Sequence, residues 1–225
     1  MLFTLRAGVF YGVLVLFTLC IGLPSLLLLP SRRACMLLAR LWNQSVLWLL
    51  ARIVGIRVRI FGEIPAGAAI FASQHQSAIE TFALQVALHN PAFILKKELL
   101  RIPFFGWILA RLAPVAIDRS AGKAAAAQIA EQGLARLKEG RRLVIFPEGT
   151  RRPVGAPLKL KSGGIWALYQ LGYPVLPVAL NTGQFWPKKG LKRAGIAQIH
   201  IAPPLPEGLS KDALLEALAT AYAGD

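Results

Sequence analysis

One long apolar stretch near the N-terminus limits what this chain can fold into. No charged residue occurs between Ala7 and Pro30, and nearly all of the residues there are apolar. As a helix the stretch would be about 36 Å long at roughly 1.5 Å per residue, and the hydrocarbon core of a bilayer is about 30 Å thick. It is therefore long enough to cross a membrane. Pro24 lies inside it, so a kinked helix or a re-entrant pair that enters one leaflet also fits the pattern.

The residues after this stretch indicate whether it is retained and how it is oriented. No small-x-small cleavage pattern precedes Arg32 and Arg33, so we expect the segment to stay rather than to be removed as a signal peptide. The chain has no acidic residue before Glu63, whereas Arg32, Arg33 and Arg40 follow the apolar stretch directly. By the positive-inside rule, we expect the following domain on the cytoplasmic face of the cell membrane, with the N-terminal segment embedded.

A second apolar segment covers residues 34–56 and has a different pattern. Its polar residues fall near one stripe of a helix, and Trp42 and Trp48 lie on the apolar remainder. The stripe contains Arg33, Arg40, Asn43, Gln44 and, less well aligned, Arg52. The pattern predicts an interfacial helix, and an ordinary core helix with its polar stripe in water remains the alternative. We therefore expect residues 1–56 to form N-terminal membrane-anchoring helices.

Charge and apolar content together favour an anionic bilayer as partner. The chain has 26 Lys and Arg against 11 Asp and Glu, a net charge of +15, and 55% of its residues are hydrophobic. This composition excludes a disordered chain, and 16% charged residues is low for a soluble nucleic-acid-binding protein. Cys20 and Cys35 lie in apolar sequence and have no metal-ligand spacing, so we expect neither a disulfide framework nor a metal site.

From about Ile56 the pattern changes to alternating strands and helices, which predicts an α/β domain over residues 57–225. The predicted strands are Ile56–Phe61, Ala69–Ala72, Ala92–Leu95, Val115–Ile117, Leu143–Phe146, Val175–Leu180 and Ile196–Ile201. Predicted helices cover residues 78–89, 122–139, 163–171 and 210–222. This alternation is typical of a mostly parallel central sheet flanked by helices.

A histidine and an acid follow the second predicted strand. The chain lacks the nucleophile elbow, the phosphate-binding loop, the dinucleotide fingerprint and the zinc-protease motif. His75 and Glu80 stand where open α/β sheets place their active sites, at the carboxyl end of a strand. The two side chains would diverge on one continuous helix, so they meet only if His75 lies in a loop. Ser77 and Glu80 form a capping box that predicts this break, and capping alone is the simpler role for Glu80.

Two further blocks combine cations with a strand end. Phe146–Arg151 reads Phe-Pro-Glu-Gly-Thr-Arg after an apolar strand, where Gly149 permits a tight turn and Arg151 offers a forked cation suited to phosphate. The segment Lys96–Trp107 places two lysines before an apolar run broken by proline and glycine. A lipid headgroup and its tail can both be met there, although a solvated charge run beside a core helix gives the same pattern.

In order and spacing these blocks resemble the glycerolipid acyltransferases of the 1-acyl-sn-glycerol-3-phosphate acyltransferase family, from about residue 60 to 205. Besides the His75 and Phe146 blocks, the resemblance includes Ile117-Asp118-Arg119 and the proline-containing strand Val175–Ala179. Glu80 departs from the aspartate that is usual in the family. The resemblance implies acyl transfer from acyl-CoA or acyl carrier protein to the free hydroxyl of lysophosphatidic acid, giving phosphatidic acid. It implies no metal, no cofactor beyond the thioester co-substrate and no covalent intermediate.

This resemblance assigns roles to single residues. His75 would be the general base that accepts the hydroxyl proton, and Glu80 would hold its tautomer and stabilise the imidazolium. The acceptor phosphate would meet Arg151, one of Lys96 or Lys97, and Arg119. Glu148, Gly149 and Thr150 complete the expected substrate-binding set.

Other functions remain open at this point. The acceptor can be another lyso-lipid, such as a lyso-amino-acid lipid, because the motifs specify acyl transfer more firmly than the headgroup. A non-catalytic membrane lipid-binding or scaffold protein is an alternative of a different class, with Glu80 as its visible departure. Nucleic-acid binding is not expected, because the chain lacks interleaved aromatic residues and a recognised module.

Overall fold

The structure is a computed structural model that describes residues 2–118 and 121–224. Its α-helices are α1 (Leu2–Ser25), α2 (Arg32–Leu49), α3 (Ile79–Ala87), α4 (Phe105–Arg111), α5 (Lys123–Lys138), α6 (Ser162–Tyr169) and α7 (Lys211–Ala223). The strands are β1 (Ile56–Phe61), β2 (Ile70–Ser73), β3 (Ala92–Lys96), β4 (Val115–Ile117), β5 (Leu143–Ile145), β6 (Val175–Leu180) and β7 (Gly195–Ile201). Short 3₁₀ helices are η1 (Leu26–Leu28), η3 (Lys97–Arg101) and η4 (Thr182–Gln184), and η2 (Leu50–Val54) is a π-helical turn that extends α2.

The strands form one sheet in the order β1-β7-β6-β2-β5-β3-β4. The described pairings are parallel except that of β6 with β7. Because β1 pairs in parallel with β7, these two strands run opposite to the other five. The expected mostly parallel α/β sheet is confirmed. The register places Ile70 beside both Leu143 and Val175, so the apolar residues of β2, β5 and β6 lie at one level.

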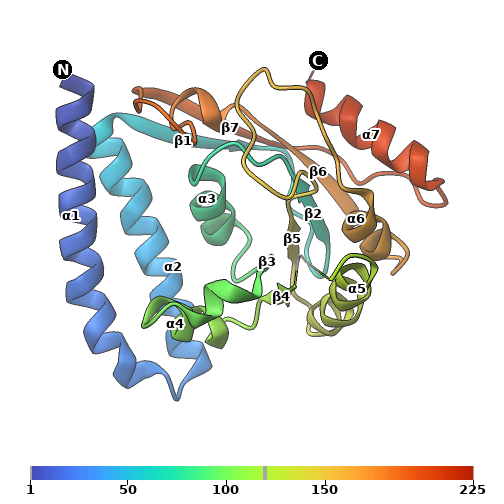
Figure 1. Cartoon of the computed structure of the whole chain (residues 1–225), viewed down its shortest axis with the longest axis horizontal. Helices are drawn as coiled ribbons and strands as arrows, with labels where there is room; N and C mark the ends of the chain where they lie inside the picture. Colours follow the sequence, from blue (N-terminus) through green and yellow to red (C-terminus); the bar gives the residue numbers. More distant parts are fainter. Residues whose placement is uncertain (1, 119–120, 225) are drawn as a thin grey trace.

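Helices cover both faces of the sheet (Figure 1). On one face, α5, α6 and α7 contribute Ile129, Leu168 and Leu218 to a buried cluster with the strands. On the other face, Leu84 of α3 packs with Phe71 of β2 in a second cluster. A fully buried side chain of this size contributes about 1.5–3 kcal/mol, so the sheet is held rigidly between two apolar layers.

Two N-terminal helices stand beside this sandwich as an antiparallel hairpin (Figure 1). Pro24 lies in the last turn of α1, next to the reversal at residues 26–31, so it ends the helix rather than kinking its middle. Trp42 of α2 donates a hydrogen bond from Nε1 to Oγ1 of Thr18 on α1 at 3.1 Å. By length and composition, the windows Thr4–Gly22 and Arg32–Val54 are both apolar enough to cross a membrane.

The second helix divides its apolar residues between the domain and the surface. Val46 and Leu50 are fully buried in a cluster with Ile79 of α3, whereas Leu37 and Trp48 are exposed. One side of this helix therefore lies in the domain core, as the alternative interpretation expected, and the interfacial role of its exposed side stays a prediction.

One member of the predicted polar stripe does not face water. Asn43 is buried and donates from Nδ2 to the carbonyl of Ala39 at 2.6 Å, one turn back along α2. This bond gives its amide group a partner inside the helix, which lowers the cost of burying the polar residue.

Candidate active site

Four neighbouring parallel strands end at the same edge of the sheet, and each predicted block follows one of them. His75 comes shortly after β2, Phe146 directly after β5, Lys96 at the end of β3 and Asp118 after β4. The carboxyl-end placement expected from the sequence is thus confirmed, and it gathers residues far apart in the chain. Arg119, which we expected to contact phosphate, lies outside the described residues.

His75 contacts Glu80 through one ring nitrogen. Nδ1 of His75 lies 2.9 Å from Oε1 of Glu80. The Glu80 side chain is fully buried, whereas 17% of the His75 side chain is exposed. With the proton on Nδ1 directed at the carboxylate, Nε2 carries the lone pair that can accept a proton. The imidazole also stacks on Phe146, with ring centroids 4.1 Å apart.

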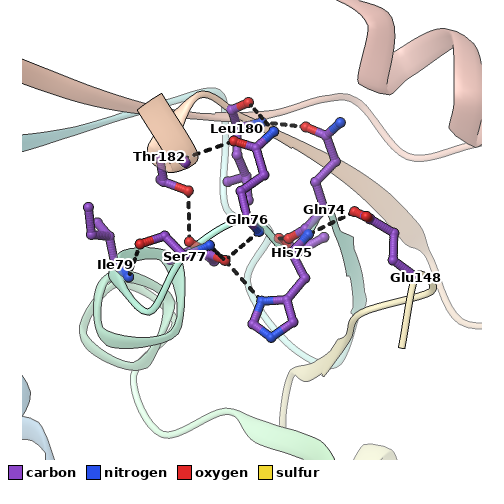
Figure 2. A network of polar contacts seen from close by, with 11 residues as sticks. Gln74, His75, Gln76, Ser77, Ile79, Glu148, Leu180 and Thr182 are labelled. Carbon is purple, nitrogen blue, oxygen red and sulfur yellow. Dashed lines mark hydrogen bonds and ion pairs between the residues drawn. The ribbon is translucent and has the colours of Figure 1, made fainter. Parts of the chain in front are cut away.

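Glu80 serves both as a helix cap and as the partner of His75. Its Oε1 accepts the backbone N–H groups of Gln76 at 2.9 Å and Ser77 at 2.7 Å. Oγ of Ser77 accepts the N–H of Ile79 at 3.2 Å, at the start of α3. Figure 2 shows these bonds converging beside the imidazole. The two interpretations of Glu80 that the sequence left open are therefore compatible.

The second oxygen of the Glu80 carboxylate has a partner from a distant part of the chain. Oγ1 of Thr182 donates a hydrogen bond of 2.8 Å to Oε2 of Glu80, and both side chains are fully buried. Sequence reasoning missed Thr182, because a single threonine after a strand carries no recognisable pattern.

The Phe146–Arg151 block and the residue after it form hydrogen bonds with the loop that carries His75. The backbone N–H of His75 donates to Oε1 of Glu148 at 2.9 Å, and the carbonyl of His75 accepts the N–H of Arg152 at 2.8 Å. Glu148 is buried, and this burial raises the pKa of its carboxyl, although the His75 N–H acts in the opposite direction. We expected Glu148 to bind the substrate, but in the structure its carboxylate binds the backbone of His75.

Gly149 is the point at which this block turns. It has a φ of 68°, and its N–H donates to the carbonyl of Phe146 at 2.9 Å. A Cβ at this position would lie 3.1 Å from Cδ of Lys161, so the side chain of Lys161 passes close over the glycine. Thr150 is exposed and Arg151 is half-buried, and neither side chain makes a hydrogen bond or ion pair within the described residues. Their polar groups remain available for a ligand.

The two lysines at the end of β3 bind nearby acids. Nζ of Lys96 lies 3.4 Å from Oε1 of Glu98, and Lys97 forms an ion pair with Asp118. Both lysine side chains are about half exposed, and no described contact joins either of them to His75. The apolar run that follows forms η3 and α4, a short helix that the sequence analysis did not predict.

Two glutamines beside His75 attach its loop to the end of β6. Oε1 of Gln74 accepts the N–H of Leu180 at 2.8 Å, and Nε2 of Gln76 donates to the carbonyl of the same residue at 3.0 Å. Oε1 of Gln76 accepts the N–H of Gly183 at 3.1 Å. The loop that carries His75 is thereby fixed on two sides, by β6 and by the Glu148 block (Figure 2).

Comparison with known proteins assigns this chain to a family. A family model described as acyltransferase matches residues 55–181. A 1-acyl-sn-glycerol-3-phosphate acyltransferase from Pseudomonas aeruginosa is 43% identical over 193 residues, covering 84% of this chain and 75% of the relative. The chain belongs to the 1-acyl-sn-glycerol-3-phosphate acyltransferase family. It is an acyltransferase, as its motifs predicted, and the family resemblance is confirmed.

More distant relatives extend this similarity. A human protein named 1-acyl-sn-glycerol-3-phosphate acyltransferase alpha is 28% identical over 210 residues, which cover 90% of this chain and 73% of the human protein. The crystal structure of the 1-acyl-sn-glycerophosphate (LPA) acyltransferase PlsC from Thermotoga maritima matches 97% of this chain and 92% of that one, with a TM-score of 0.74 and 24% identity. This last match supports the fold.

Proposed function

We propose that this acyltransferase moves a fatty acyl group from acyl-CoA or acyl carrier protein to the free hydroxyl of 1-acyl-sn-glycerol-3-phosphate. The product would be phosphatidic acid, a precursor in phospholipid biosynthesis. The observation that carries the proposal is the His75–Glu80 contact, which holds Nδ1 at 2.9 Å from the carboxylate and leaves Nε2 to accept a proton. The acceptor is taken from the names of the relatives, including the one that is 43% identical.

The chemistry follows from this arrangement. Nε2 of His75 removes the proton from the acceptor hydroxyl as its oxygen attacks the thioester carbonyl. A tetrahedral intermediate forms, the C–S bond breaks, and the thiolate leaves and takes the proton from the imidazolium. The buried carboxylate of Glu80 stabilises the positive imidazolium while it exists. The acyl group passes directly to the acceptor, so the mechanism uses neither a metal nor a covalent enzyme intermediate.

The acceptor phosphate would bind along the sheet edge beside His75. Arg151 follows β5, the strand next to β2, and its guanidinium has no partner within the described residues. A guanidinium can hold two phosphate oxygens at once. We propose Arg151 as the main phosphate ligand, with Gly149 and Thr150 beside it and with Lys96, Lys97 and Arg119 adding positive charge.

A membrane position for the enzyme rests on its apolar surface. Most of α1 is exposed although it is almost entirely apolar, and Phe104, Phe105 and Trp107 around the start of α4 are also exposed. Guanidinium Nη2 of Arg111 on α4 donates to the carbonyl of Pro30 at 2.8 Å, which places α4 beside the tip of the α1–α2 hairpin. We propose that these surfaces meet an anionic bilayer on its cytoplasmic face.

A direct assay tests this function. The purified protein in detergent micelles is given radiolabelled acyl-CoA and, in parallel, lysophosphatidic acid, lysophosphatidylcholine or a lyso-amino-acid lipid. We expect labelled phosphatidic acid as the main product. Efficient transfer to another lyso-lipid with none to lysophosphatidic acid would overturn the acceptor assignment. Absence of transfer to every acceptor, with acyl-CoA and with acyl carrier protein as donors, would favour the scaffold alternative.

A further inference from the structure

The hydroxyl of Thr182 completes the hydrogen bonding of the Glu80 carboxylate. Oε1 is held by groups close in sequence, namely the His75 ring and the two backbone N–H groups of Gln76 and Ser77. Oε2 is held at 2.8 Å by Thr182, which lies in η4 directly after β6. Within the described residues, this is the one hydrogen bond to the Glu80 carboxylate that comes from another part of the fold.

The geometry gives this bond a specific effect. Rotation about the last side-chain bond of Glu80 moves both carboxylate oxygens together, so a donor that holds Oε2 also limits where Oε1 lies. The hydroxyl of Thr182 stops that rotation and so fixes the plane in which Oε1 meets Nδ1 of His75. A fully buried carboxylate oxygen without a hydrogen-bond donor is costly. Removal of the Thr182 hydroxyl would therefore make the Glu80 carboxylate turn toward another donor.

Thr182 is itself held firmly. Its carbonyl accepts the N–H groups of Phe185 and Trp186, both at 3.1 Å, and the following N–H, that of Gly183, donates to Gln76. Trp186 then packs edge-on against Phe10 of α1, with ring centroids 5.7 Å apart. The hydroxyl is therefore presented by a rigid turn that is attached both to the His75 loop and to the N-terminal helix.

We propose that Thr182 is a positioning residue for acyl transfer, which acts on His75 through Glu80. The proposal rests on the proposed function, because it assumes that His75 is the base. In this structure the Glu80 carboxylate joins the backbone of the His75 loop to the hydroxyl at the end of β6.

The test compares Thr182→Val, which keeps the shape and loses the hydroxyl, with Thr182→Ser, which keeps the hydroxyl. We expect kcat of the valine variant to fall roughly 10- to 100-fold, the range for losing a hydrogen bond to a charged group, with little change in KM for either substrate. Thr182→Ser should restore most of the rate. If valine prevents folding, the pair Thr182→Ala and Thr182→Ser isolates the same hydroxyl.

A matched control separates positioning from general stability. Tyr222→Phe also removes a buried hydroxyl, which donates to the carbonyl of Ala72 at 2.9 Å and makes no contact with Glu80. We expect this variant to lower the melting temperature but to leave kcat unchanged. Equal loss of kcat in Tyr222→Phe and Thr182→Val would overturn the proposal.

Coupling to Glu80 gives the decisive comparison. In a Glu80→Gln background, Thr182→Val should cost little further activity, because the neutral amide already lacks the negative charge whose position Thr182 fixes. The same fold-loss in both backgrounds, or a wild-type rate for Thr182→Val, would overturn the proposal. A parallel assay of His75→Ala distinguishes failure of this inference about Thr182 from failure of the proposed mechanism. An inactive His75→Ala with a fully active Thr182→Val contradicts only this inference, whereas an active His75→Ala contradicts the proposed mechanism itself.

Discussion

The backbone N–H of His75 donates a hydrogen bond of 2.9 Å to Oε1 of Glu148, which joins two blocks that lie 73 residues apart in the sequence. Neighbouring strands β2 and β5 bring these blocks together at the sheet edge. The block that contains Arg151, the proposed phosphate ligand, therefore also fixes the loop that carries the proposed base. Changes at Glu148 should accordingly act on stability and on the position of His75.

Replacement of Glu148 should show a defined pH dependence. Burial raises the pKa of its carboxyl above the ordinary value of 4.5, so the folded protein holds this proton more tightly than the unfolded chain. Stability is then lost as the pH rises from about that value through the raised pKa. Glu148→Gln keeps an oxygen acceptor for the His75 N–H and carries no charge.

We therefore expect the melting temperature of Glu148→Gln, relative to wild type, to increase between pH 4 and pH 8. Glu148→Ala removes the acceptor and should be less stable than wild type throughout, by about 1–3 kcal/mol. A difference between the glutamine variant and wild type that does not change with pH would contradict this account of the carboxyl.

Glu80 variants separate charge from capping. Glu80→Asp should keep substantial activity, since it preserves the charge beside His75. Glu80→Gln should lose most of it, about 10²-fold in kcat, because a neutral amide does not stabilise the imidazolium. Steady-state kinetics at saturating substrate check both. Equal rates for glutamine and glutamate at this position would reduce Glu80 to a helix cap.

Replacement of Arg151 should lower the affinity of the enzyme for its lyso-lipid substrate. A single ammonium cannot reproduce the two parallel bonds of a guanidinium to phosphate, so Arg151→Lys should raise KM for lysophosphatidic acid about tenfold or more. Arg193→Lys is the matched control, because Arg193 is exposed and lies in the basic run Lys188–Arg193, which we expect to attract an anionic bilayer rather than to bind the substrate. An unchanged KM in Arg151→Lys would leave this residue as a solvated turn arginine.

Removal of residues 1–30 should weaken membrane binding without abolishing it. The exposed apolar face of α2 and its arginines remain, and high salt should release the truncated protein more readily than the full chain. Deletion also removes Phe10 from the core. The double variant Leu16→Gln with Leu19→Gln therefore serves as a second test, because it changes only the exposed face of α1. Vesicle flotation at low and high salt measures both. A truncated protein that is entirely soluble at low salt would assign residues 31–56 to the domain core.

Much of the fold could be predicted from local pattern. Strands β1, β4 and β6 match their predicted bounds, because each is a short apolar or alternating run between turn residues. The direction of β7 could not be predicted, since the pattern of a strand is the same whichever way it runs. Helix α4 was missed because Pro103 and Gly106 indicate a loop, and the chain enters the helix through Phe104 at a φ of 62°.

The site could be predicted only where its residues are close in sequence. The spacing of His75 and Glu80 and the capping signal allowed a contact between them, the family resemblance predicted it, and the structure shows it. The bonds from Thr182 and Glu148 depend on strand order, which brings residues 102 and 73 positions apart into contact. The chemistry of its block makes Arg151 a candidate phosphate ligand, and this stays a prediction. Glu148 in the same block binds the backbone of His75, which no residue pattern specifies.

The role of His75 as base is tested most directly by kcat/KM of His75→Ala for acyl transfer from acyl-CoA to lysophosphatidic acid. Melting temperature and vesicle flotation on the same preparation establish that the variant is folded and membrane-bound. Loss of the base should lower kcat/KM by about 10²–10⁴-fold or more, while both controls stay at wild-type values. Near-normal turnover by a folded His75→Ala protein would contradict the mechanism.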